Sequence, residues 1–81
     1  MLDKSKFKLN PDDQIKFKSK REKGHLGQTE IWTYDILDKD GNVIGSIKET
    51  EHTNVRGLNS YKNVVQYNSE GEIVFEDKTE F

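Results

Sequence analysis

Two similar turn sequences constrain the fold of this chain more than any other feature. They are residues 37–44 (LDKDGNVI) and residues 67–74 (YNSEGEIV), thirty residues apart. Each has Asp or Asn at its second position, Gly three residues later, and two β-branched residues at its end. Asp or Asn favours the start of a type I turn, and Gly readily adopts the left-handed conformation that closes such a hairpin. The two segments therefore predict two β-hairpins.

The composition favours strands in the rest of the chain. The 81 residues include no alanine, which is the strongest helix former. Runs rich in β-branched and aromatic residues predict strands at about 14–22, 29–38, 43–51, 61–67 and 72–78. We expect a mostly β protein with about five strands, arranged as a small antiparallel sheet or a partly open barrel. The single domain would span residues 14–81, after an extended or flexible basic lead over residues 1–13.

Several classes of protein are excluded by what the sequence lacks. The chain has no cysteine and no long apolar stretch, which excludes a disulfide framework, a thiolate site and a transmembrane helix. We recognise no secretory signal and no lipidation motif, so we expect a cytoplasmic protein without membrane association. Glycine-rich phosphate loops and nucleophile motifs are also missing, so we expect no cofactor and no enzymatic activity.

The charge is divided unevenly along the chain, whose net charge is −2. Residues 1–23 contain eight basic and four acidic side chains, whereas residues 24–81 contain five basic and eleven acidic ones. If residues 14–22 form a strand, Lys16, Lys18 and Lys20 project from one face, because side chains alternate along a strand. Such lysines protect an edge strand from aggregation. With Arg21 and Lys23 they are also suited to follow the phosphates of RNA.

The second predicted strand is apolar on both faces. Trp32, Tyr34 and Ile36 share one face, and Ile31 and Leu37 share the other. This pattern indicates a central strand, a covered sheet or an association surface. Aromatic residues on the predicted strands are expected to build most of the core; they are Phe17, Trp32, Tyr34, Tyr61, Tyr67 and Phe75.

The first turn also resembles a calcium-binding EF-hand loop, over residues 38–49. Acidic or amide side chains stand at loop positions one, three, five and twelve, namely Asp38, Asp40, Asn42 and Glu49. The sixth position, however, is Val43 where the EF-hand needs glycine, and the flanking segments are typical of strands. A β-hairpin turn accounts for the same residues without a metal, so we expect no metal site.

A polar group of residues near the second histidine provides an enzymatic alternative. His52, Arg56, Tyr61 and Lys62 have the chemistry of an acid, a base and a phosphate clamp, as a metal-independent ribonuclease requires. Polar loops often contain the same residue types without any catalytic role. Under that interpretation His25 and His52 are ordinary surface residues.

These observations favour a small non-enzymatic binding protein that docks on another macromolecule. Its partner is expected to be a protein, for which the chain acts as an inhibitor or adaptor, such as an inhibitor of a host or defence protein encoded by a phage or mobile element. An RNA-binding module and a small ribonuclease are the alternatives, and a homo-oligomer remains open. The candidate contact residues are Lys16, Lys18, Lys20, Arg21, Lys23, Trp32, Tyr34, Arg56, Tyr61 and Lys62.

Overall fold

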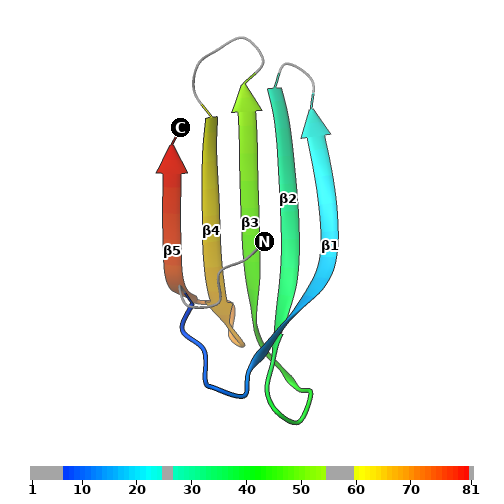
Figure 1. Ribbon diagram of the computed structural model, residues 1–81, viewed down its shortest axis with the longest axis vertical. Helices are drawn as coiled ribbons and strands as arrows, with labels where there is room; N and C mark the ends of the chain where they lie inside the picture. Colours follow the sequence, from blue (N-terminus) through cyan, green and yellow to red (C-terminus); the bar gives the residue numbers. More distant parts are fainter. Residues whose placement is uncertain (1–6, 25–26, 55–59, 81) are drawn as a thin grey trace.

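The chain forms one antiparallel β-sheet of five strands in sequential order, as the computed structural model shows (Figure 1). The structure describes residues 7–24, 27–54 and 60–80. The strands are β1 (Gln14–Gly24), β2 (Gly27–Leu37), β3 (Val43–Asn54), β4 (Ser60–Asn68) and β5 (Ile73–Glu80). The predicted fold class is therefore confirmed, and of the two predicted arrangements the structure has the open sheet. None of the described residues belongs to a helix that could cross a membrane.

The sheet is long and consists of a single layer. Its dimensions are 46 × 22 × 20 Å, and each strand contacts only its neighbours within the sheet. Because side chains alternate along a strand, every strand contributes to two opposite faces. We call these the Trp32 face, which includes Ile36 and Ile47, and the Tyr61 face, which includes His52.

The two predicted hairpins are confirmed, and their turns have nearly the same geometry. Gly41 and Gly71 have φ angles of 85° and 84°, in the left-handed region. In the first turn the Asp38 side chain accepts hydrogen bonds from the backbone N–H groups of Asp40 and Asn42, both at 2.9 Å. The Asn68 side chain does the same in the second turn, again at 2.9 Å to both N–H groups. Local turn chemistry thus fixes both hairpins.

The core cluster lies on the Trp32 face, at the end of the sheet that contains the turns of Gly41 and Gly71. We call this the hairpin end. Ile47 and Ile36 expose 0% and 2% of their surface, and Phe7, which is 8% exposed, covers them. The ring of Phe7 also packs edge-on against Phe75, with 5.7 Å between centroids. In Figure 1 the blue segment that contains Phe7 crosses the hairpin end of the sheet from β5 towards β1.

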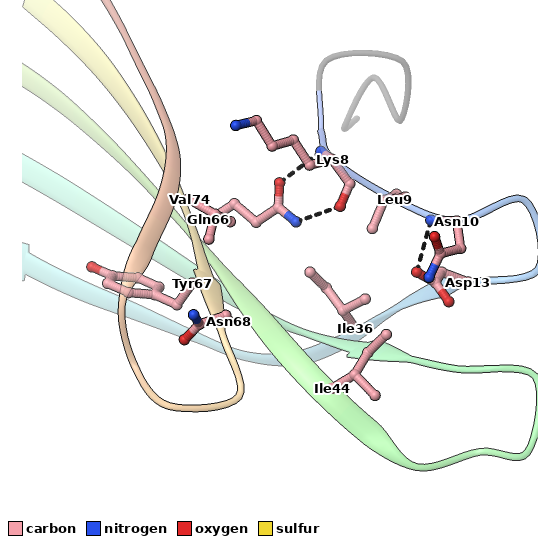
Figure 2. A pocket seen from close by; sticks show the side chains of 10 residues that line it. All are labelled: Lys8, Leu9, Asn10, Asp13, Ile36, Ile44, Gln66, Tyr67, Asn68 and Val74. Carbon is pink, nitrogen blue, oxygen red and sulfur yellow. Dashed lines mark hydrogen bonds between the residues drawn. The ribbon is translucent and has the colours of Figure 1, made fainter.

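The covering segment is held in place by one side chain. The amide of buried Gln66 accepts a hydrogen bond from the Lys8 backbone N–H and donates one to the Lys8 carbonyl, both at 2.9 Å (Figure 2). It therefore satisfies the Lys8 backbone as a neighbouring strand would. Residues 10–13 then make a turn, in which the Asp13 N–H donates to the Asn10 carbonyl at 3.0 Å.

These contacts refine two sequence expectations. Residues 7–9 of the basic lead lie against the sheet and contribute Phe7 to its core, whereas residues 1–6 are outside the described part of the chain. The expectation that the six strand aromatics build most of the core is wrong, because only Tyr34 and Phe75 of the six pack against it and Phe17 is 56% exposed. Phe17 instead contacts the edge of the Tyr34 ring, with 5.8 Å between centroids.

Replacing a turn glycine tests the hairpin geometry. We expect Gly41→Ala and Gly71→Ala each to lower the free energy of unfolding by about 1 kcal/mol, because a Cβ atom disfavours positive φ. The matched variant Gly71→Asn should lose less, since Asn tolerates the left-handed region better than Ala. Chemical denaturation measures all three, and equal losses for Ala and Asn at residue 71 would contradict this account.

Removing the Gln66 amide tests whether it retains the covering segment. We expect Gln66→Leu to lower the free energy of unfolding by about 1–2 kcal/mol, since the Lys8 backbone loses two part-buried hydrogen bonds. Hydrogen exchange at the Lys8 amide should accelerate in the same variant. The control is Gln28→Leu, the same change at an exposed position of the same face. Unchanged Lys8 protection in Gln66→Leu would show that other contacts hold the segment.

Candidate binding faces of the sheet

A β-bulge in β1 divides the basic stripe that the sequence predicts. Lys16 lies opposite Asp35, but the register shifts between Phe17 and Ser19, and Lys20 then lies opposite Trp32. Asp35 and Trp32 project from opposite faces of β2. The prediction that Lys16, Lys18 and Lys20 share one face is therefore wrong, because one extra residue reverses the alternation beyond it. The Lys18 ammonium lies 4.0 Å from the Asp35 carboxylate, on the side of Lys16.

As a result, charge is sorted by face rather than by position along the chain. Among the described strand residues, the Trp32 face has five acidic and two basic side chains. They are Glu22, Glu30, Glu49, Glu51 and Asp77, with Lys20 and Lys62. Up to residue 79 the Tyr61 face has six basic and two acidic side chains, and the register places Glu80 opposite Tyr61. They are Lys16, Lys18, Arg21, Lys23, Lys48 and Lys78, with Asp35 and Glu76.

Trp32 is the centre of the acidic face, beyond the part that Phe7 covers. The Lys20 ammonium lies 5.4 Å from the centroid of the Trp32 ring and 3.3 Å from the Glu22 carboxylate. Lys20 therefore bridges the indole and an acidic neighbour by a cation–π contact and an ion pair. Trp32 itself is partly exposed and lies opposite Glu49 on β3.

Glu49 is a buried carboxylate in this face. It exposes 6% of its surface, and one of its oxygens lies 3.8 Å from the Lys62 ammonium. Burial raises the pKa of the Tyr34 hydroxyl, and the negative charge of Glu49 raises it further. The Lys62 ammonium thus pairs with the carboxylate that lies opposite Trp32.

Three glutamates lie side by side near the end of the sheet opposite the hairpins. Glu22, Glu30 and Glu51 are directly opposite one another on β1, β2 and β3. Like charges in this position destabilise a sheet, so their combined negative potential favours a cationic group from outside. Within the described ranges, no three His, Cys, Asp or Glu side chains are arranged to hold a metal ion.

The opposite face has a stack of two rings. His52 and Tyr61 are adjacent on β3 and β4, with 5.3 Å between ring centroids and 24° between ring planes. His52 Nδ1 is 2.7 Å from the Thr29 hydroxyl, and the Lys78 ammonium is 5.4 Å from the centroid of the Tyr61 ring. These contacts fix the positions of both rings on the basic face.

The structure does not gather the residues predicted for a ribonuclease. His52 and Tyr61 lie on the Tyr61 face, whereas Lys62 lies on the Trp32 face and pairs with Glu49. Strand alternation separates Tyr61 from Lys62, because neighbours in a strand point to opposite sides. Arg56, the fourth member of the set, is outside the described residues.

A cavity of about 400 Å³ lies between residues 8–13 and the hairpin end of the sheet (Figure 2). Its apolar side chains include Ile36, Ile44 and Val74. The polar side chains that face it are already engaged: Gln66 binds Lys8, and Asn68 binds the backbone of its own turn. The cavity therefore follows from the way Gln66 holds the covering segment.

The predicted contact residues are thus divided between two surfaces. Lys20, Trp32, Tyr34 and Lys62 lie on the Trp32 face, and Lys16, Lys18, Arg21, Lys23 and Tyr61 lie on the Tyr61 face. The sequence reasoning did not single out Glu22, Glu30, Glu51, Lys48 or Lys78. For β3 the two faces could be read from the sequence, because alternation along the strand places Lys48 on one face and Glu49 and Glu51 on the other. For β1 it was not, because the bulge decides the faces.

Comparison with known proteins adds no assignment. No protein-family model, no curated protein and no solved structure matches the chain. Its function is therefore argued from the charges and rings of the two faces.

The loop that resembles an EF-hand is a hairpin turn in the structure. Both oxygens of Asp38 accept hydrogen bonds from within the turn, one from two backbone N–H groups and the other from the Asn42 amide at 3.3 Å. The backbone hydrogen bond from Asn42 is the largest cause that lowers the pKa of Asp38 below its ordinary value of 3.8. The carboxylate thus has the role that the neutral Asn68 amide has in the second turn.

The side chain of Asp38 ionises, whereas that of Asn68 does not. The first turn should therefore make the stability of the protein depend on pH, and Asp38→Asn should remove this dependence. Because the pKa of Asp38 is lower in the folded state, ionised Asp38 stabilises the protein above its unfolded pKa of about 3.9. That stabilisation is lost as the pH falls through the lower folded pKa. We expect Asp38→Asn to remove this part of the acid dependence of Tm while changing Tm little at pH 7.

The reciprocal change provides the control. Asn68→Asp should add a similar acid-dependent loss of Tm, since the second turn has the same geometry. Thermal melts of the three proteins between pH 2.5 and 7 measure both effects. Parallel curves for the original protein and Asp38→Asn would contradict a role of the Asp38 carboxylate in the turn.

Proposed function

We propose that this chain is a non-enzymatic binding protein that docks on a basic surface of another protein. The contact region is the Trp32 surface, which we define as Lys20, Glu22, Glu30, Trp32 and Glu51. The observation that carries the proposal is the partly exposed Trp32, surrounded by carboxylates on an open single-layer sheet. Its role would be that of an inhibitor or adaptor in the cytoplasm, as the sequence led us to expect.

The Trp32 surface combines two properties of protein interfaces. Trp is enriched among the residues whose truncation costs the most binding energy, because its large ring fills a pocket on the partner. Charged groups around such an anchor contribute less energy but steer the approach of a partner with opposite charge. Glu22, Glu30 and Glu51 lie in the row next to Trp32, so they can serve this purpose.

The scaffold also suits binding without catalysis. Trp32 and Glu30 belong to β2, which is hydrogen-bonded on both sides, so little conformational freedom is lost when a partner binds. The separation of His52 from Lys62 supports the non-enzymatic part of the proposal, because an acid and a phosphate clamp must reach one substrate.

Affinity capture with matched charge reversals tests the proposal. A partner that binds the original protein should bind Glu30→Lys at least about 10-fold more weakly, because the rim carboxylates face its basic surface. Trp32→Ala should cost about 2 kcal/mol or more, which is roughly 30-fold in Kd. Binding should weaken as salt is raised, since the steering charges are exposed.

The control is Glu76→Lys, which makes the same charge change on the opposite face. It should leave the affinity within about twofold. Equal weakening by Glu30→Lys and Glu76→Lys would show that net charge, and not the Trp32 surface, determines binding. Full affinity in both Trp32→Ala and Glu30→Lys would exclude this surface altogether.

A further inference from the structure

The basic side chains of the Tyr61 face are not explained by protection of a sheet edge. Lysines on an edge strand discourage aggregation, which accounts for the cations of β1. Lys48, however, lies on β3, the central strand of the sheet, where both sides are already hydrogen-bonded. A protein of net charge −2 nevertheless places six basic side chains on this one face, against two acidic ones up to residue 79 and the position of Glu80 opposite Tyr61.

The cations lie across the full width of the sheet. One row runs Arg21, Ile31, Thr50, Asn63 and Lys78 over all five strands, with a positive charge at each end. Four strand spacings separate its ends by about 19 Å. In the adjacent row Lys48 lies between Thr33 and Val65, near the middle of that span. Arg21, Lys48 and Lys78 thus form a broad basic triangle on a flat surface.

Rings and hydroxyl groups lie between and beside these charges. The stacked rings of His52 and Tyr61 occupy the row next to Arg21 and Lys78, and Thr29 binds His52 in that row. Thr33 and Thr50 supply further hydroxyl groups on the same face. A sheet face that combines cations with aromatic rings is typical of surfaces that hold single-stranded nucleic acid, whose phosphates bind the cations and whose bases contact the rings.

We propose that the Tyr61 face binds single-stranded RNA through its phosphate backbone, with Arg21 and Lys48 as principal contacts. Lys78 lies over the Tyr61 ring, so the strand meets a cation and an aromatic side chain at the same place. An acidic protein is the competing occupant of a basic surface, and competition between ligands distinguishes it from RNA. Because this face is opposite to the Trp32 surface, the proposal is independent of the proposed function.

Salt dependence measures the phosphate contacts directly. A labelled twelve-nucleotide oligouridine should bind with an affinity that falls with salt, at a slope of about −0.7 for each contact. Three to four contacts predict binding roughly 20–50-fold weaker at 200 mM than at 50 mM salt. Fluorescence anisotropy supplies the affinities. The absence of binding at 50 mM, or a slope near zero, would overturn the proposal.

Matched pairs of substitutions test which face binds. Arg21→Gln with Lys48→Gln should weaken binding at 50 mM salt at least about 10-fold and reduce the slope by about 1.4. Lys20→Gln with Lys39→Gln removes the same charge from the Trp32 face and a turn, and should leave binding within about threefold. Equal weakening by both pairs would overturn the proposal, because general attraction to cations then explains binding. The two double variants should have similar melting temperatures.

A competitor of the other chemical class separates RNA from an acidic protein. Polyglutamate with the same number of negative charges should displace the oligouridine only at much higher concentration, since it has no bases to stack. A twelve-base-pair RNA duplex should also bind more weakly, because its bases are paired and unavailable. Equal competition by polyglutamate would overturn the RNA assignment in favour of an acidic protein partner.

Discussion

The hydrogen bonds between the Gln66 amide and the Lys8 backbone are the contacts on which the rest of the core depends. On the Trp32 face of this single-layer sheet, Phe7 and Leu9 pack across the core cluster, whereas Val65, which is 6% exposed, is buried on the other face. Ile36 and Ile47 are buried because the segment crosses above them. The buried Gln66 amide stabilises this crossing, since it forms hydrogen bonds with both the N–H and the carbonyl of Lys8.

Those parts of the fold that depend on nearby residues could be predicted from the sequence. Asp38 and Gly41, like Asn68 and Gly71, determine their turns within five residues, so both hairpins and the order of the strands they connect were predictable. The position of Phe7 was not predictable, because it depends on a contact between Lys8 and Gln66, which are 58 residues apart. The bulge at Lys18 was also missed, since neither Gly nor Pro marks it.

The candidate site, too, was predictable only where nearby residues determine it. Most of the contact residues that the sequence indicated are on the sheet, but they belong to two surfaces, and only the register shows which. Lys20 is the clearest case, because it was predicted beside Lys16 and instead contacts the Trp32 ring. Once the faces are separated, the modest net charge of the chain resolves into an acidic surface and a basic one. Each surface suits a partner of the opposite charge.

The bulge in β1 determines which face of the sheet each charged side chain of that strand occupies. Deleting Lys18, the one residue between Phe17 and Ser19, would remove the bulge, and residues 19–23 would keep their partners on β2. Lys16 and Lys20 would then still lie on opposite faces, because three steps would separate them in a regular strand. A residue gained or lost at the bulge during divergence therefore leaves the other charges of both surfaces in place.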